Sequence, residues 1–92
     1  MPWTIHKLAE RLGLEYRGDG TCALARAASL ESAGPDALPF FVPGTAVERL
    51  AATRAGAVIV CADDVDAAPC VSIVRDEPYL YFARASQLLH PL

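Results

Sequence analysis

The residues from Phe40 to Thr45 have the types and the spacing to hold a small planar ligand. Phe40 and Phe41 are adjacent aromatic residues, and an aromatic face can stack on a planar base. Pro43 and Gly44 then turn the chain, and a helix is expected to begin at Thr45. The backbone N–H groups at a helix start attract anions. The chemistry that this stretch favours is therefore nucleotide binding, with a stacked base and an anion at the helix start.

The alternative for these phenylalanines is a place in the core. The run from Leu38 to Val42 is short, apolar and aromatic, and phenylalanines on such a strand are more often buried than exposed at a site. Thr45 and Glu48 stand at capping-box spacing, which predicts a helix from Thr45 to a stop at Gly56. One face of this helix would carry Val47, Leu50, Ala51 and Ala55.

The sequence offers little support for catalysis. A nucleophile triad needs a histidine that a carboxylate orients beside a serine or cysteine, and the two histidines, His6 and His90, lack such a motif. The HExxH, GxSxG and P-loop motifs and paired catalytic carboxylates are also missing. We therefore expect a protein that binds a ligand, with no catalytic residue and no cofactor.

Metal and disulfide chemistry are equally poorly supported. Cys22, Cys61 and Cys70 are odd in number and lack the spacing of a zinc site or a disulfide framework. The acidic segment from Asp63 to Asp66 lacks the glycine and the distal glutamate of a calcium loop. We therefore expect no bound metal and a reducing compartment. That compartment is expected to be the cytoplasm, since the stretch that begins at Met1 does not resemble a secretion signal.

Composition predicts one folded domain, residues 1–92. Apolar residues make up 53% of the chain and charged residues 21%, which is typical of a globular protein. The net charge is −3 and the eight basic residues are scattered, so neither nucleic acid nor an anionic membrane surface is an expected partner. No apolar run reaches the roughly 20 residues of a membrane span.

The remaining signals predict the elements that position the site. Thr4 and Gly13 are the expected cap and stop of a first helix, and a last helix, after the one that begins at Thr45, is expected to open at Pro78. Apolar residues lie round most of the circumference of that last helix, so we expect both core packing and a second contact surface. The alternation around Gly18–Gly20 predicts a hairpin from Leu14 to Ala28.

Two apolar runs predict central strands that are covered on both faces, Ala57–Cys61 and Cys70–Val74. The expected fold class is α/β: one small domain with a mixed sheet of about five short strands and three helices. The predicted hairpin would lie toward one edge of this sheet.

The order of several phrases resembles the N-terminal domain of UDP-3-O-acyl-glucosamine N-acyltransferase, which adds the second acyl chain in lipid A synthesis. The phrases are Leu8–Leu12, Gly18–Gly20, Ala28–Pro35, Leu50–Val60 and Pro78–Ala83. The resemblance implies a cytoplasmic protein of lipopolysaccharide synthesis in a Gram-negative bacterium. The related UDP-binding first domain of muramyl peptide ligases is the nearest competing family, and the fold is expected to be similar to it.

In the family, this domain holds the uracil of the UDP-sugar, whereas catalysis belongs to a following β-helix of hexapeptide repeats. The printed sequence contains no such repeat, and neither histidine matches the catalytic position. The resemblance therefore implies a domain that is not catalytic on its own, within or related to an acyltransferase. Its implied partners are UDP-acyl-glucosamine, bound through the uracil, and a following β-helix domain or another subunit.

The family's uracil site reads Phe, then Asn three residues on, then Tyr three residues further. Those positions here are Phe40, Pro43 and Ala46, so one aromatic ring is kept and the amide and the second ring are replaced. The resemblance makes Phe40 the platform for the uracil. The surrounding wall would consist of Phe41, Pro43, Gly44, Thr45 and Ala46. The alternative function is a free-standing protein-interaction module that kept the fold and lost nucleotide binding.

Overall fold

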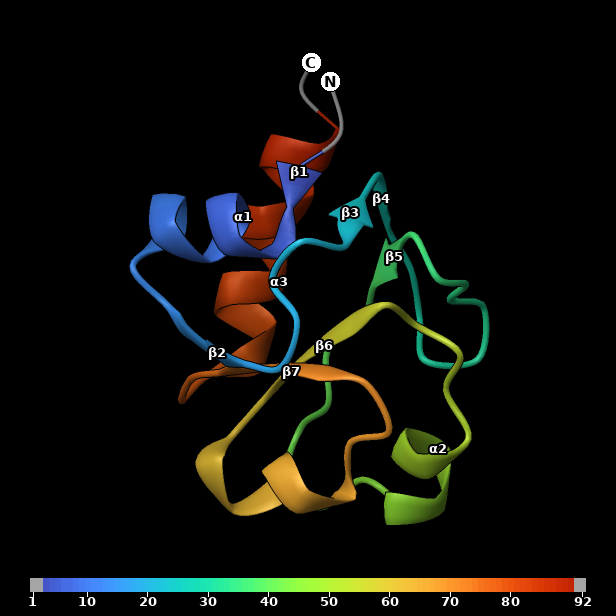
Figure 1. The fold of residues 1–92 in the computed structure, drawn as a ribbon. Helices are drawn as coiled ribbons and strands as arrows, with labels where there is room; N and C mark the ends of the chain where they lie inside the picture. Colours follow the sequence, from blue (N-terminus) through green and yellow to red (C-terminus); the bar gives the residue numbers. More distant parts are fainter. Residues whose placement is uncertain (1–2, 91–92) are drawn as a thin grey trace.

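Helices lie on both sides of a central group of strands in the computed structural model, which describes residues 3–90 (Figure 1). The first helix, α1 (Ile5–Leu12), begins where the sequence predicts. The Thr4 side chain accepts a hydrogen bond from the Lys7 N–H at 3.1 Å, and Gly13 ends the helix in the left-handed conformation with φ 71°. Three apolar residues of α1 are buried: Ile5, Leu8 and Ala9.

The last helix, α3 (Pro78–Leu89), also begins at the predicted proline. Pro78 and Ala85 are buried, whereas Tyr79 is 66% exposed and Leu80 is 40% exposed. The expected core packing of this helix is thus confirmed, whereas the second contact surface stays a prediction, with Tyr79 and Leu80 as exposed apolar residues. The Trp3 indole N–H donates to the Leu88 carbonyl oxygen at 3.2 Å and joins the two ends of the fold.

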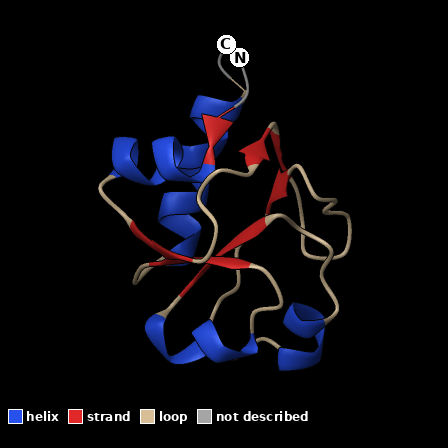
Figure 2. Cartoon of the chain, in the orientation of Figure 1, coloured by secondary structure: helices blue, strands red, loops and turns tan. Residues whose placement is uncertain are grey.

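The strands are short and form three hydrogen-bonded groups (Figure 2). In the first group, β7 lies between β2, which is antiparallel to it, and β6, which is parallel. The second group pairs β4 with β5 in parallel, and the third pairs β1 with β3 in antiparallel orientation. Their bounds are β1 Trp3–Thr4, β2 Glu15–Arg17, β3 Ala23–Leu24, β4 Arg26–Ala27, β5 Ala37–Leu38, β6 Ala57–Val60 and β7 Val71–Val74.

Backbone hydrogen bonds beyond β5 connect two of these groups. The Phe41 N–H donates to the Ile59 carbonyl oxygen at 2.9 Å, and the Ile59 N–H donates to the Pro39 carbonyl oxygen at 3.1 Å. The chain from β5 to Phe41 therefore runs beside β6, and the order across the molecule is β4, β5, β6, β7, β2. The predicted small α/β domain with short strands in mixed arrangement is confirmed.

The predicted hairpin from Leu14 to Ala28 is wrong. β2 pairs with β7, with Tyr16 opposite Ile73, and β3 pairs with β1. Between β2 and β3, the Asp19 carboxylate accepts hydrogen bonds from the Thr21 N–H and hydroxyl, which makes a wider turn than a two-residue hairpin loop. Pairing with the central strand β7 prevails because it packs Tyr16 against the core.

The sheet is covered on both faces, as its apolar strands predict. Alternate residues of β6 point in opposite directions: Ile59 belongs to the core beneath α1 and α3, and Val58 belongs to the core beneath α2. The second face is covered by α2 (Val47–Ala51) and the 3-10 helix η1 (Ala62–Ala67), which lie together at the bottom of Figure 1. We call these the α1–α3 face and the α2–η1 face.

The predicted start and end of the second helix are wrong. The Thr45 N–H donates to the Val42 carbonyl oxygen and closes a turn, so Ala46 becomes the N-cap of α2 without a side-chain hydrogen bond. The capping box of Thr45 and Glu48 is therefore not formed. The helix ends five residues before Gly56 because the chain leaves it to bury Thr53 and Ala55 on the way to β6.

The acidic segment from Asp63 to Asp66 lies within η1 and is largely in contact with solvent. Within residues 3–90, no three His, Cys, Asp or Glu side chains gather closely enough to hold a metal ion. None of the helices in that same part of the chain is long and apolar enough to cross a membrane.

Candidate functional site

A pocket of about 200 Å³ opens at the end of the extended chain that runs beside β6. The turn after this chain and the α2 helix close one side, and the loop before β5 closes the other. Its lining residues are Ser29, Leu30, Phe40, Phe41, Val42, Thr45 and Arg49. Four of them lie between Phe40 and Thr45, the stretch that the sequence singled out, so the pocket lies where a ligand was expected.

The two phenylalanines of this stretch have different environments. Phe41 is 1% exposed and packs with Leu50 and Val58 in the core beneath α2. Its ring can form a wall of the pocket but cannot stack fully on a ligand. Phe40 is partly exposed and packs against the core beneath α1 and α3. Of the two phenylalanines, it is therefore the one with accessible surface.

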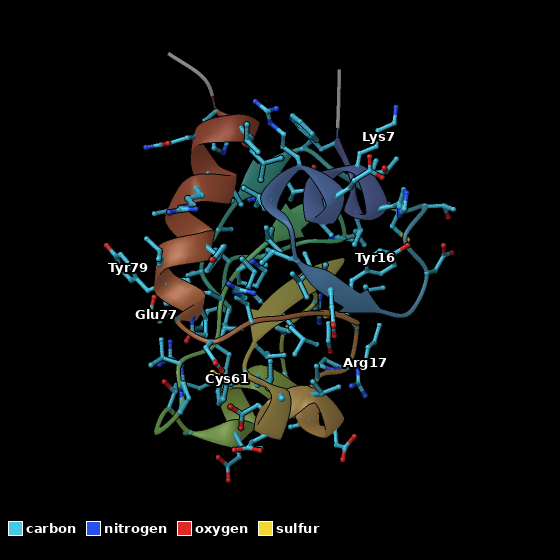
Figure 3. The ribbon with its side chains drawn as sticks, turned by 90° about the vertical axis from the view of Figure 1, so that its left-hand side faces the viewer. Lys7, Tyr16, Arg17, Cys61, Glu77 and Tyr79 are labelled. Carbon is cyan, nitrogen blue, oxygen red and sulfur yellow. The ribbon has the colours of Figure 1, made fainter. Side chains whose placement is uncertain are left out.

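Aromatic neighbours from α3 hold the Phe40 ring. The Phe82 ring centroid lies 4.6 Å away at a tilted angle, and the Tyr79 ring stands edge-on at 5.5 Å. Figure 3 shows the Tyr79 side chain projecting away from α3 at the surface of the molecule. The ring of Phe40 is thus fixed by packing, which suits a residue that must present a rigid face.

The structure only partly gathers the other predicted site residues. Thr45 lines the pocket, whereas Pro43, Gly44 and Ala46 are exposed in the turn before α2 and do not line it. Gly44 has φ 96°, a left-handed conformation that explains a glycine at this turn. With only five residues, α2 is too short to serve as the anion-binding helix start that the sequence suggested.

The opposite wall of the pocket is held by a buried hydroxyl. The Thr53 hydroxyl, on a residue that is 8% exposed, donates to the Leu30 carbonyl oxygen at 2.8 Å. In the same loop, the Ser29 hydroxyl donates to the Ser32 hydroxyl at 3.0 Å. These bonds fix the loop against the end of α2, so the pocket is formed before any ligand arrives.

Sequence reasoning missed the one charged side chain among the described residues that line this pocket. Arg49 lies on α2, and its guanidinium forms an ion pair with the Glu31 carboxylate of the opposite loop. A backbone hydrogen bond and the bond from Arg49 hold the pKa of Glu31 below its usual value. The spacing of 18 residues gives no periodic signal, so only the folded chain brings the two together.

A second and larger hollow, about 500 Å³, lies at the start of α3. Its lining includes the carboxylates of Glu15, Asp76 and Glu77, with Arg75 as the basic residue. Arg75 is drawn to the Tyr81 ring, 4.9 Å from its centroid. Three carboxylates around one arginine disfavour an anionic nucleotide, so the smaller pocket is the better candidate for the ligand that the sequence suggests.

Cys61 and Cys70 have the properties of structural thiols. Burial raises the pKa of the Cys70 thiol to about 11. Burial, followed by the nearby carboxylates of Asp76, Asp64 and Asp63, raises the pKa of Cys61 as well. Neither thiol is activated as a nucleophile, because a reactive cysteine needs a lowered pKa.

Fold and pocket together define a small α/β domain with a mainly apolar pocket at one edge of its sheet. Comparison with known families then gives a specific match. Residues 21–88 match the family model of UDP-3-O-(3-hydroxymyristoyl) glucosamine N-acyltransferase, LpxD. The chain belongs to this family, and the matched segment includes every residue that lines the pocket.

Curated relatives support the same family assignment. The chain is 44% identical over 88 residues to the UDP-3-O-acylglucosamine N-acyltransferase of Alkalilimnicola ehrlichii, covering 96% of this chain and 25% of the relative. The enzyme of the same name from Granulibacter bethesdensis is 39% identical over 93 residues, covering 99% of this chain and 27% of the relative. That of Aromatoleum aromaticum is 42% identical over 87 residues, with 95% and 26% covered. The chain thus spans about a quarter of the length of the curated relatives it matches.

Proposed function

We propose that this chain is the N-terminal, substrate-binding domain of a UDP-3-O-acylglucosamine N-acyltransferase of lipid A synthesis. Its role is to bind the uridine end of the UDP-acylglucosamine substrate. The observation that carries this proposal is the position of the pocket. Phe40, Phe41 and Thr45 line it, and they belong to the stretch that resembles the uracil site of the family.

Phe40 is the proposed platform for the uracil ring, with Phe41 and Thr45 as the inner wall and Pro43, Gly44 and Ala46 in the adjoining turn. Its fixed position between α3 and the pocket supports this role. Stacking on one aromatic ring is worth about 1–3 kcal/mol per base. With Pro43 and Ala46 in place of the amide and the second ring, we expect a dissociation constant near millimolar, not micromolar, since each factor of ten is about 1.4 kcal/mol.

The proposed domain contributes binding and leaves acyl transfer to another part of the enzyme. Its support is the share of the relatives' length, about three quarters, that this chain does not match. The partner that follows from the proposal is a further domain of the enzyme, expected to be the β-helix of the family, in the cytoplasm. On its own, the 92-residue chain should not transfer an acyl group from acyl carrier protein to a UDP-sugar.

A titration followed by amide NMR tests the binding proposal. UMP and then UDP-N-acetylglucosamine are added to millimolar concentration, and shifts are expected at residues 29–30 and 40–49. Phe40→Ala should abolish them. Tyr81→Ala is the matched control, because it removes a half-buried aromatic ring at the larger hollow and should leave the shifts unchanged. If millimolar ligand shifts no amide resonance of the wild-type pocket, or shifts mainly those near Tyr81, the proposal is refuted.

A second candidate function is a protein-interaction module without nucleotide binding, and the exposed apolar side chains favour it. Val42, Val47, Tyr79 and Leu80 are between 40% and 66% exposed. Their occupant would be a further domain or a second copy of the chain. Sedimentation of the chain from 10 to 500 µM tests whether a second copy binds. Association that is lost in the double variant Tyr79→Ser, Leu80→Ser supports this function. A monomer at every concentration contradicts it.

A further inference from the structure

Arg49 lies at the mouth of the pocket with its charged group only partly engaged. Its side chain is 52% exposed, and that of its partner Glu31 is 56% exposed. Two guanidinium nitrogens point to a single Glu31 oxygen, Oε1. A guanidinium has five N–H donors. Among the residues that the structure describes, this pairing therefore leaves some donors for solvent or a ligand.

The size of the pocket limits which part of a nucleotide it can enclose. About 200 Å³ is less than the roughly 300–1,000 Å³ of sites that bury a whole drug-sized ligand. A base fits such a space, whereas the phosphates of a bound nucleotide must remain at the mouth. The residue with positive charge at that mouth is Arg49, since α2 has only five residues and offers little helix-dipole attraction.

We propose that Arg49 binds the phosphate that follows the ribose of the nucleotide, and that Glu31 holds the guanidinium in position for it. This inference rests on the proposed uridine site and adds to it a residue for the phosphate. Arginine suits the task because its planar fork of donors matches phosphate oxygens. Glu31 orients the fork from the opposite side of the mouth and also repels the incoming phosphate, so it limits the affinity.

The test is a comparison of uridine, UMP and UDP by amide NMR titration at constant ionic strength. UMP and UDP should bind the wild-type chain about fivefold more tightly than uridine, the size expected for one partly exposed charge-assisted contact. Arg49→Gln should abolish this difference and leave the uridine dissociation constant unchanged. Glu31→Gln should tighten UMP two- to threefold by removing the like charge, again without changing uridine.

Two further variants separate the contact from general effects. Arg49→Lys keeps the charge without the fork and should retain part of the UMP preference. Arg11→Gln is the charge-matched control, because Arg11 lies on α1, outside the pocket lining, and its loss should leave all three affinities unchanged. Thermal unfolding of each variant verifies that the fold is intact.

The outcomes distinguish this inference from the proposed function. If uridine binds but UMP binds no more tightly, or if Arg49→Gln weakens uridine as much as UMP, the phosphate role of Arg49 is overturned and the uridine site stands. An equal loss of UMP preference in Arg11→Gln also overturns it, since the effect is then one of net charge. If none of the three ligands binds, the uridine site fails, and this inference fails with it.

Discussion

The two faces of the sheet are built in contrasting ways. The α1–α3 face carries helices of eight and twelve residues, and α1 has a side-chain cap at Thr4 and a left-handed glycine at its end. On the α2–η1 face are a five-residue helix without a side-chain cap and a 3-10 helix. The candidate pocket opens beside the second, less regular face. Regular elements thus provide the scaffold, and a turn, a loop and a short helix line the candidate pocket.

Two adjacent residues, Phe40 and Phe41, contribute to the two different faces. Phe40 packs toward α3 and keeps an exposed part, whereas Phe41 is enclosed beneath α2. Because side chains alternate along an extended chain, neighbouring phenylalanines serve different faces. Phe40 thus keeps some exposed surface, whereas Phe41 anchors the strand in the core.

The largest expected effect separates these two residues. Phe41→Ala should lower the free energy of unfolding by about 3–5 kcal/mol, because it empties a fully enclosed position. Phe40→Ala should cost clearly less, about 1–2 kcal/mol, because its side chain is partly exposed. Urea unfolding of both variants measures the difference. Equal costs would mean that Phe40 is a core residue with nothing left for a ligand.

A substitution at Gly56, where the chain passes from α2 into β6, tests the junction of the two faces. A β-carbon there would overlap the carbonyl oxygen of Pro35, a backbone atom that cannot easily move. We expect Gly56→Ala to cost about 1–3 kcal/mol, the usual price of overpacking. At Gly13 the situation differs: a β-carbon would meet open space, and the strain in Gly13→Ala would come from the φ of 71° alone. Thermal unfolding of Gly56→Ala that matches the wild type would contradict this packing.

The helix starts provide a smaller and more selective effect. Thr4→Ala removes the acceptor of the Lys7 N–H and should cost about 1 kcal/mol. Thr45→Ala removes no helix cap, so its cost should stay within about 0.5 kcal/mol. Urea unfolding of the pair gives the comparison. If Thr45→Ala costs as much as Thr4→Ala, the capping box that the sequence suggested does form in solution.

The smallest effect is expected in the turn between β2 and β3, outside both faces. The Thr21 hydroxyl and backbone N–H, both bonded to Asp19, hold the pKa of that carboxyl below its usual value. A lowered pKa stabilises the fold above the pKa of the unfolded chain, about 3.9, and this contribution is lost as pH falls through the folded value. Asp19→Asn should therefore lower the melting temperature slightly at pH 7 and leave it unchanged at pH 2. An equal loss at both values would assign the effect to packing.

The sequence predicted the α1–α3 face better than the other face, and the reason is physical. Thr4, Gly13 and Pro78 act locally, so their roles can be inferred from a few neighbouring residues. The same local logic failed at Thr45, where the turn to Val42 decides the helix start, and at Gly18–Gly20, where β7 attracts β2 away from a hairpin. The first outcome reflects a competing local turn, and the second depends on a tertiary contact.

The candidate site was predictable in part for the same reason. The stretch around Phe40 is contiguous and therefore visible in the sequence, and it does line the pocket. The loop at Ser29 and Leu30, its anchor Thr53 and the ion pair of Arg49 with Glu31 join distant parts of the chain. Only the fold brings these residues together, so no spacing pattern could have revealed them.

The central claim is that the pocket beside Phe40 receives the base of a uridine nucleotide. Intermolecular NOEs from the uracil H5 and H6 protons of UMP, measured at millimolar ligand, test it most directly. We predict contacts to the ring protons of Phe40 and to side chains at Leu30 and Thr45. Contacts to the hollow at Tyr81 and Arg75, or no contacts at all, would contradict the account.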